Sequence, residues 1–218
     1  MKLCLVTDRR RLAEATGAPP AAWTAVLEEQ VAAAAAAGVD YIQVREPDLD
    51  ASDLVNLVRS LVRLTRRSPA QILVNDRVDV AIAAGAAGVH LKERGMLPQE
   101  VRRIVPPGFV IGCSVHTIAT ASARKAADFL VAGTVLPTRS KSSTTYLGAD
   151  GLRQIVKATT QPVFGIGGLD HTSMPLLVSA GGAGLAAVGA FIPSTREDVS
   201  GFLQKRVIAL RFGLETSL

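Results

Sequence analysis

Short, uninterrupted apolar runs separated by longer stretches with helical periodicity dominate the hydrophobic pattern of the chain. The runs predict eight strands, at residues 3–7, 41–44, 72–75, 88–91, 110–114, 129–132, 163–166 and 185–188. A continuous apolar run is typical of a strand that is buried on both faces, as in a parallel sheet. Apolar residues three and four apart predict a helix from Ser52, and Pro98 suits the first turn of another helix at 98–105.

Four junctions between these helices and strands share one local pattern. An Ala-rich stretch ends in a small residue and an apolar run follows, at residues 36–42, 84–90, 126–130 and 179–185. Glycine suits the left-handed residue that ends a helix. Eight strands alternating with helices predict a closed (β/α)8 TIM barrel, an α/β fold with parallel strands. The alternative, an open doubly wound sheet, usually shows Gly-x-Gly-x-x-Gly after its first strand, where this chain has Thr7-Asp8-Arg9.

Composition and charge restrict the class of protein further. The 218 residues suit one barrel, so we expect a single TIM-barrel domain over residues 1–218. The net charge is +5, but Arg9 to Arg11 and the other basic residues form no block, which predicts a solvated surface rather than a nucleic-acid site. A positive field of this size still attracts an anionic substrate.

Cysteine use and hydropathy predict a cytoplasmic protein without a membrane partner. Cys4 and Cys113 lie inside apolar runs with no paired spacing, so buried, reduced thiols are expected rather than a disulfide framework or a zinc site. The chain starts on a strand-like run without a charged segment before a long apolar stretch, so no signal peptide is expected. The alanine run at 32–37 is too short to span a bilayer.

Polar residues that follow the predicted strands are the candidates for a site, because a barrel carries its site at the carboxyl ends of its strands. Gln43 and Arg45 are two residues apart and point the same way. The guanidinium fork of Arg45 suits a phosphate or carboxylate, and equally a salt bridge in the barrel mouth. Asp76, next to Asn75, suits the cap of the following helix, or contact with a metal or a substrate amine.

Glycines after the last two strands predict a phosphate site. Gly167, Gly168 and Gly189 allow backbone amides to approach an oxyanion, at the loops where barrels frequently bind phosphate. Lys141 lies in a long polar loop at 137–148 and is a candidate cationic ligand. Among three histidines, His116 lies just past a strand end, where a barrel keeps its acid/base groups, so it is the candidate catalytic residue.

With these motifs assembled, the chain resembles the thiamine phosphate synthase superfamily, which also contains thiazole tautomerases. The resemblance rests on seven segments in order: 6–8, 43–46, 75–79, 88–91, 112–117, 137–141 and 165–168. It implies a barrel, a homodimer, and a small phosphorylated thiazole or a pyrimidine diphosphate as substrate.

The resemblance to the synthase is incomplete. The synthase joins hydroxymethylpyrimidine diphosphate to thiazole phosphate and releases pyrophosphate. The resemblance implies that Gln43, Arg45, Asn75 and Lys141 bind the diphosphate, with Asp76 as a ligand of Mg²⁺. Two positions depart from the family pattern: Pro47 replaces a lysine, and Gly95 stands where a second metal-binding Asp is expected. Losing a cation and a carboxylate together predicts weak diphosphate binding, unless Glu93 replaces the missing carboxylate.

The tautomerase requires no metal or other cofactor, and its histidine base matches His116 in Ser114-Val115-His116. We therefore expect an isomerase of thiamine biosynthesis in which His116 moves the proton. In this hypothesis Gln43 and Arg45 face the substrate carboxylate, and the glycines and Lys141 bind its phosphate. A magnesium-dependent synthase, which is a transferase, is the first alternative. A non-catalytic paralogue that binds a thiamine precursor is the second.

Overall fold

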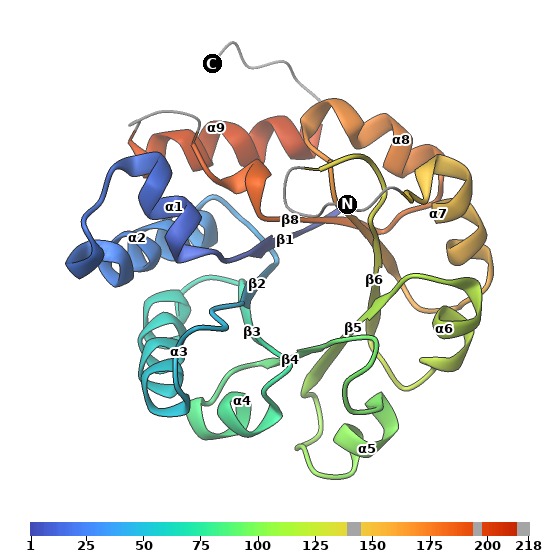
Figure 1. Cartoon of the computed structure of the whole chain (residues 1–218), viewed down its shortest axis with the longest axis horizontal. Helices are drawn as coiled ribbons and strands as arrows, with labels where there is room; N and C mark the ends of the chain where they lie inside the picture. The colour runs from blue at the N-terminus through green and yellow to red at the C-terminus, as the bar shows by residue number, and fades with distance from the viewer. Residues whose placement is uncertain (139–144, 194–197, 213–218) are drawn as a thin grey trace.

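Eight parallel strands form a closed barrel (Figure 1), in a computed structural model that describes residues 1–138, 145–193 and 198–212. The strands are β1 Lys2–Val6, β2 Tyr41–Val44, β3 Gln71–Asn75, β4 Gly88–Leu91, β5 Val110–Val115, β6 Phe129–Gly133, β7 Val163–Ile166 and β8 Gly184–Ala187. Each strand pairs with the next in chain order, and β8 closes the barrel by pairing Leu185 with Leu3 of β1. The predicted (β/α)8 barrel is therefore confirmed.

Helices surround the barrel and connect successive strands (Figure 1). They are α1 Arg9–Thr16, η1 Pro20–Ala22, α2 Trp23–Ala36, α3 Ala51–Thr65, α4 Val78–Ala84, α5 Pro98–Arg102, α6 Ile118–Ala123, α7 Gly148–Lys157, η2 His171–Ser173, α8 Met174–Ser179, η3 Gly189–Phe191 and α9 Val199–Phe212. The α5 helix ends before the predicted residue 105. Val105 precedes Pro106, and the residue before a proline is disfavoured in helical conformation.

Alternating residues of each strand face two different cores. In β1, Leu3 and Leu5 pack against the helices, whereas Cys4 and Val6 belong to the smaller cluster inside the barrel. Both cysteines are free and buried, as expected, and burial raises the pKa of the Cys4 thiol to about 12. Inside and outside are both filled by side chains, so the substrate site has to lie at an end of the barrel.

The amino-terminal end of the barrel interior is filled by aromatic rings. Tyr41 stacks on Phe129 with ring centroids 5.1 Å apart, and Phe129 lies 5.0 Å from Phe164. Glycines make room for these rings: a Cβ at Gly112 would lie 2.4 Å from the Phe129 ring, and one at Gly184 would lie 2.9 Å from the Phe164 ring. This end is closed by apolar packing, which leaves the carboxyl end for polar chemistry.

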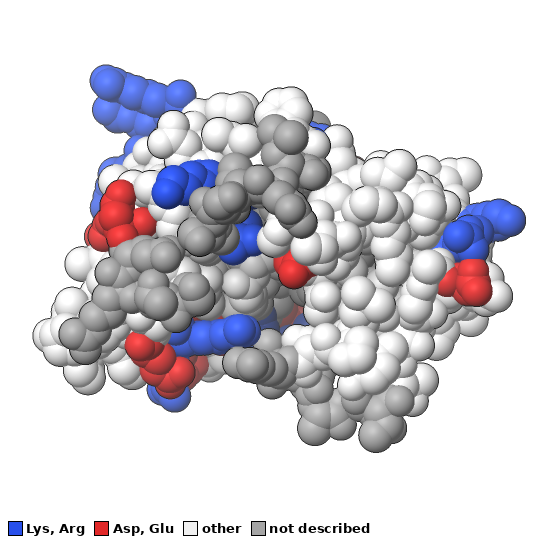
Figure 2. Space-filling model, turned by 90° about the horizontal axis from the view of Figure 1, so that it is seen from above, with Lys and Arg blue, Asp and Glu red and all other residues white. Residues whose placement is uncertain are grey.

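The surface charges are dispersed, with one exception to the expected pattern. On the face in Figure 2, Lys and Arg side chains stand in separate groups with Asp and Glu beside several of them. Arg9, however, is buried, so the expectation of a solvated side chain is wrong for this residue. Its guanidinium pairs with Glu46 and Asp48 across the β1–α1 and β2–α3 loops. In the described ranges, no helix has the length and apolar character that crossing a bilayer requires.

Candidate active site

Four polar side chains from neighbouring strands point into the carboxyl-terminal mouth of the barrel: Gln43 on β2, Asn75 on β3, His90 on β4 and Ser114 on β5. They form two pairs. Gln43 Nε2 donates to Asn75 Oδ1 at 2.9 Å, and His90 Nε2 lies 2.9 Å from Ser114 Oγ. Each alternates with apolar neighbours that face the helices, so strand periodicity directs all four inward. The structure thus brings the predicted Gln43 and Asn75 together.

His90 forms the floor of this mouth as a neutral side chain. Burial lowers its pKa to about 4, an effect that the charge of Asp76 opposes only in part. Its Nδ1 is buried and has no partner among the described residues. A Cβ at Gly112 would lie 2.7 Å from that nitrogen, so the glycine also makes room for the imidazole. His90 is therefore a buried, structurally constrained group.

Asp76 lies directly after β3 and is paired with Lys92, which follows β4. The Lys92 ammonium is 2.7 Å from Asp76 Oδ2, and the Lys92 backbone N–H donates to Asp76 Oδ1 at 3.3 Å. Asp76 does not cap α4: the cap residue is Arg77, without a side-chain hydrogen bond, so that expectation is wrong. Asp76 adopts φ 63°, and the described residues include no other non-glycine with positive φ.

Glu93 turns away from Asp76 and binds His116. The Glu93 carboxylate accepts from the His116 backbone N–H at 2.9 Å and lies 3.0 Å from its Nδ1. Burial raises the pKa of the Glu93 carboxyl, but hydrogen bonds from Thr120 and His116 outweigh it and lower the pKa overall. The His116 side chain is 43% exposed. The predicted candidate base therefore stands at the rim, oriented by a carboxylate.

Gln43 and Arg45, which are expected to point the same way, differ in burial. Gln43 is buried in the mouth, whereas Arg45 follows the last residue of β2 and is exposed. Its backbone N–H donates to Thr7 Oγ1 at 2.9 Å. In residues 1–138, 145–193 and 198–212, no carboxylate forms a salt bridge with its guanidinium, which leaves a cation at the rim that suits an anionic substrate.

The three predicted phosphate-binding glycines follow β7 and β8. Gly167 and Gly168 have φ of 98° and 66°, and a Cβ on either would collide with the segment after β6, at Thr134 and at the Pro137 carbonyl. Gly189 begins η3, and a Cβ there would lie 3.0 Å from Arg11 Nη2. Close packing thus requires glycine after β7, whatever the role of these amides in binding phosphate.

Lys141, the predicted cationic ligand, lies outside the residues that the structure describes.

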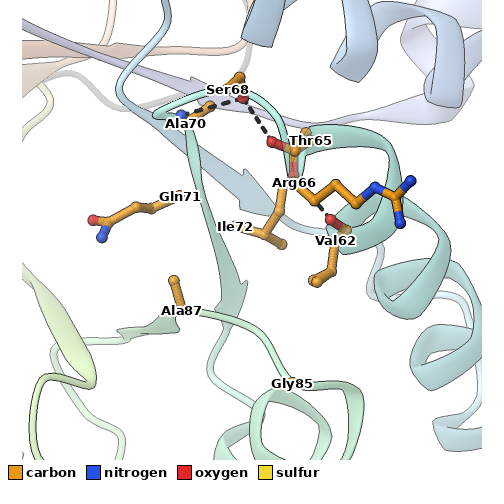
Figure 3. Close-up of a pocket in the computed structure, with 9 residues that line it drawn as sticks. All are labelled: Val62, Thr65, Arg66, Ser68, Ala70, Gln71, Ile72, Gly85 and Ala87. Atoms are coloured by element: carbon orange, nitrogen blue, oxygen red, sulfur yellow. Dashed lines mark hydrogen bonds between the residues drawn. The ribbon is translucent and has the colours of Figure 1, made fainter.

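The amino ends of the strands carry a pocket of their own. A pocket lined by Thr65, Arg66 and Ser68 from the end of α3, with Gln71 at the start of β3, lies at the amino ends of the strands (Figure 3). It therefore opens away from the mouth that carries the polar residues.

Lys92 is the member of the site that sequence reasoning missed. It follows Leu91, the last residue of β4, with no residue between. The rule that selected Gln43, Arg45 and Asn75, a polar residue at a strand end, applies to Lys92 as well. Its pairing with Asp76 depends on β3 and β4 being neighbours, as the register of Asn75 opposite His90 shows.

The residues around Asp76 do not fit a magnesium site. The position that faces its carboxylate is Gly95, where a Cβ would lie 2.7 Å from Asp76 Oδ1 but no side chain is present. An ammonium already contacts Oδ2, and Glu93 is bound to His116. Within the part of the chain that the structure describes, no three His, Cys, Asp or Glu side chains are arranged to hold a metal.

Comparisons with known proteins agree on one family. A family profile described as thiamine monophosphate synthase matches residues 3–191. A putative thiamine-phosphate synthase of Geobacter sulfurreducens is 43% identical over 172 residues, covering 77% of this chain and 81% of the relative. The thiamine-phosphate synthase of Pyrococcus abyssi is 35% identical over 192 residues, covering 87% and 86%.

A solved structure gives the same result in three dimensions. Thiamine phosphate pyrophosphorylase from Pyrococcus furiosus superposes with a TM-score of 0.79 at 31% sequence identity, covering 98% of this chain and 96% of that one. The expectation of an isomerase is therefore wrong: relatives at this level of identity are named as synthases, which are transferases. The profile match and the identities show that the chain belongs to the thiamine monophosphate synthase family.

Proposed function

We propose that this protein is a thiamine-phosphate synthase, an enzyme of thiamine biosynthesis that joins hydroxymethylpyrimidine diphosphate to thiazole phosphate and releases pyrophosphate. The observation that carries the proposal is the identity of 35% to 43% with relatives of that name across most of the chain. The gathering of Gln43 and Asn75 at one mouth supports it, because the family resemblance assigns these two residues to the diphosphate.

The chemistry of this reaction suits the residues of the mouth. A bond forms between the thiazole nitrogen and the pyrimidine methylene carbon, while the bond from that carbon to the diphosphate oxygen breaks. The electron pair leaves with the pyrophosphate, so the main requirement is stabilisation of negative charge on the leaving group. Gln43 and Asn75 offer amide groups and Arg45 a guanidinium. Lys141 remains a predicted ligand of the same anion.

The thiazole phosphate is assigned to the opposite side of the mouth. We infer that backbone amides at Gly167, Gly168 and Gly189 bind it, because barrels frequently bind phosphate in the loops after their last two strands. The left-handed conformations of Gly167 and Gly168 are compatible with this role, since such turns aim backbone N–H groups into a common space.

His116 receives a different role from the one expected for an isomerase. Formation of the new carbon–nitrogen bond requires no proton shuttle. We propose that His116 contacts the substrate from the rim and that Glu93 orients its ring. A synthase also carries the expectation of Mg²⁺ with Asp76 as a ligand, which the residues around Asp76 do not fit. The homodimer implied by the resemblance stays a prediction.

The test is an assay of the purified protein with both substrates, with thiamine phosphate detected by mass spectrometry and pyrophosphate by a coupled assay. We expect both products in equal amounts. Arg45→Gln should lower kcat/KM by at least about tenfold, the effect of a lost charge-assisted hydrogen bond. Arg63→Gln, which removes an exposed guanidinium from α3, is the matched control and should change little. Substrate binding without product would contradict the proposal and favour a non-catalytic binder.

A further inference from the structure

The ion pair between Lys92 and Asp76 occupies the place where a metal-dependent site needs a cation. The ammonium contacts Oδ2 at 2.7 Å, so a positive charge already neutralises this carboxylate. The second carboxylate that such a site needs is absent, because position 95 faces Asp76 Oδ1 and is a glycine. A site with one carboxylate and one resident ammonium attracts a divalent cation less strongly than a site with two carboxylates does.

The Lys92 ammonium retains donors for a ligand. An ammonium carries three N–H donors, and in the described ranges Asp76 is its one ion-pair partner. The Lys92 side chain is 64% exposed, whereas that of Asp76 is 25% exposed. The carboxylate therefore lies beneath the ammonium and leaves its outer side open to solvent, where an anion can approach.

The ion pair is not needed to hold the loops together. The Asp76 backbone N–H donates to the His90 carbonyl at 2.8 Å, and the Lys92 backbone N–H donates to Asp76 Oδ1. These two bonds connect the end of β3 to the end of β4 without the Lys92 side chain. An exposed ion pair also contributes little to stability. The pair is therefore poorly explained by a structural role.

We propose that Lys92 takes the place of the bound divalent cation and that this protein binds the diphosphate group of its substrate directly through the Lys92 ammonium, positioned by Asp76. The inference rests on the proposed synthase function, since it assigns the leaving group of that reaction. Lys92, Arg45 and the amides of Gln43 and Asn75 then bind the diphosphate at the ends of β2, β3 and β4.

The first experiment titrates inorganic pyrophosphate into the full-length protein by calorimetry, once with EDTA and once with excess Mg²⁺. We expect binding in EDTA, with an affinity within about threefold of that in Mg²⁺, and a loss of at least about tenfold in EDTA for Lys92→Gln. Lys157→Gln, at the exposed end of α7 on the opposite side of the barrel, is the matched control and should bind as the unmodified protein does. Binding that requires Mg²⁺, or that survives Lys92→Gln, would overturn the inference.

The second experiment rebuilds the missing site. The variant Lys92→Gln with Gly95→Asp removes the ammonium and adds a second carboxylate. A Cβ at position 95 would lie 2.7 Å from Asp76 Oδ1, so the Asp76 side chain has to rotate before the two carboxylates stand side by side. We expect Mg²⁺ to raise its pyrophosphate affinity by at least about tenfold, because magnesium then bridges carboxylates and phosphate oxygens. If pyrophosphate binding depends on Mg²⁺ equally in the double variant and in the unmodified protein, the proposal that Lys92 takes the place of the cation is contradicted. Circular dichroism confirms that each variant is folded.

The two proposals fail in different ways. If pyrophosphate binds through Lys92 in EDTA but the two substrates yield no thiamine phosphate, the synthase function falls and the anion site stands. If thiamine phosphate forms only when Mg²⁺ is present and the Lys92→Gln variant turns over normally, the synthase function stands and the role of Lys92 falls.

Discussion

Two clusters of polar and charged residues lie at the carboxyl ends of the strands and differ in the burial of their side chains. The inner cluster consists of Thr7, Arg9, Glu46 and Asp48, beside β1 and β2. The outer cluster consists of Asp76, Lys92, Glu93 and His116, beside β3 to β5. The side chains of Arg9 and Glu46 are 9% and 2% exposed, whereas those of Lys92 and His116 are 64% and 43% exposed.

The side chains of the inner cluster form most of their hydrogen bonds with one another. Thr7 Oγ1 donates to Glu46 Oε1 at 2.6 Å, and the Arg9 guanidinium contacts Glu46 and, with two nitrogens, Asp48. Burial raises the pKa of the Glu46 carboxyl, although hydrogen bonds from Thr7 and Arg9 oppose the effect. Charges that are buried and mutually paired constrain the loops, whereas the exposed charges of the outer cluster are available to a ligand.

The largest expected effect comes from removing one carboxylate from each cluster. Glu46→Ala leaves the buried Arg9 without one of its partners, so we expect a loss of about 3 to 5 kcal/mol in the free energy of unfolding. Glu93→Ala, in the outer cluster, should cost less than about 1 kcal/mol. Urea denaturation measures both. Similar losses for the two variants would remove the distinction between a structural and a ligand-binding cluster.

A second test uses pH and the buried imidazole of His90 on β4. The folded-state pKa of His90 is lowered to about 4 from 6.5, so its neutral form contributes stability above pH 6.5 that is lost as pH falls toward 4. We expect the free energy of unfolding to fall by up to about 3 kcal/mol over that window from this group. His90→Gln should flatten the decline. Equal pH profiles for this variant and the unmodified protein would contradict the burial of His90.

The smallest expected effect concerns Asp48 at the edge of the inner cluster. Its hydrogen bonds from Arg9 lower the pKa of this carboxyl to about 2, so the stability it contributes is present above pH 4 and is lost as pH falls through 2. Solvent screens this partly exposed group, so the contribution is about 1 kcal/mol. Asp48→Asn should reduce the loss of stability between pH 4 and pH 2, as measured by acid titration of the circular dichroism signal.

The strands were readable from the sequence because burial on both faces leaves a clear apolar run. The predicted bounds of β2, β4 and β7 agree with the structure, and β1 and β8 are each displaced by one residue. The predicted helix at 98–105 is too long: α5 ends at Arg102, and Val105 is disfavoured in helical conformation because it precedes Pro106. Local signals of this kind require no knowledge of distant contacts.

The partner of each polar side chain was not readable in the same way. The sequence suggested a capping role for Asp76 and solvation for Arg9 and left open whether Glu93 replaces a metal ligand, and the structure pairs these residues with Lys92, Glu46 and His116. The expectation of an isomerase rather than a synthase shows the same limit, since it depended on Gly95 and Pro47 as losses, whereas the pairing of Lys92 with Asp76 depends on contacts between strand ends.

By itself the sequence determined the barrel, because eight apolar runs alternating with helical stretches fit a closed parallel sheet, and it placed the candidate site at the carboxyl ends of the strands. Only the tertiary structure decided which charges are buried against one another and which remain open at the mouth. Closing the barrel sets residues from different strand ends at bonding distance, as it does Asp76 and Lys92, and Coulomb and hydrogen-bond energies act over those distances rather than along the chain.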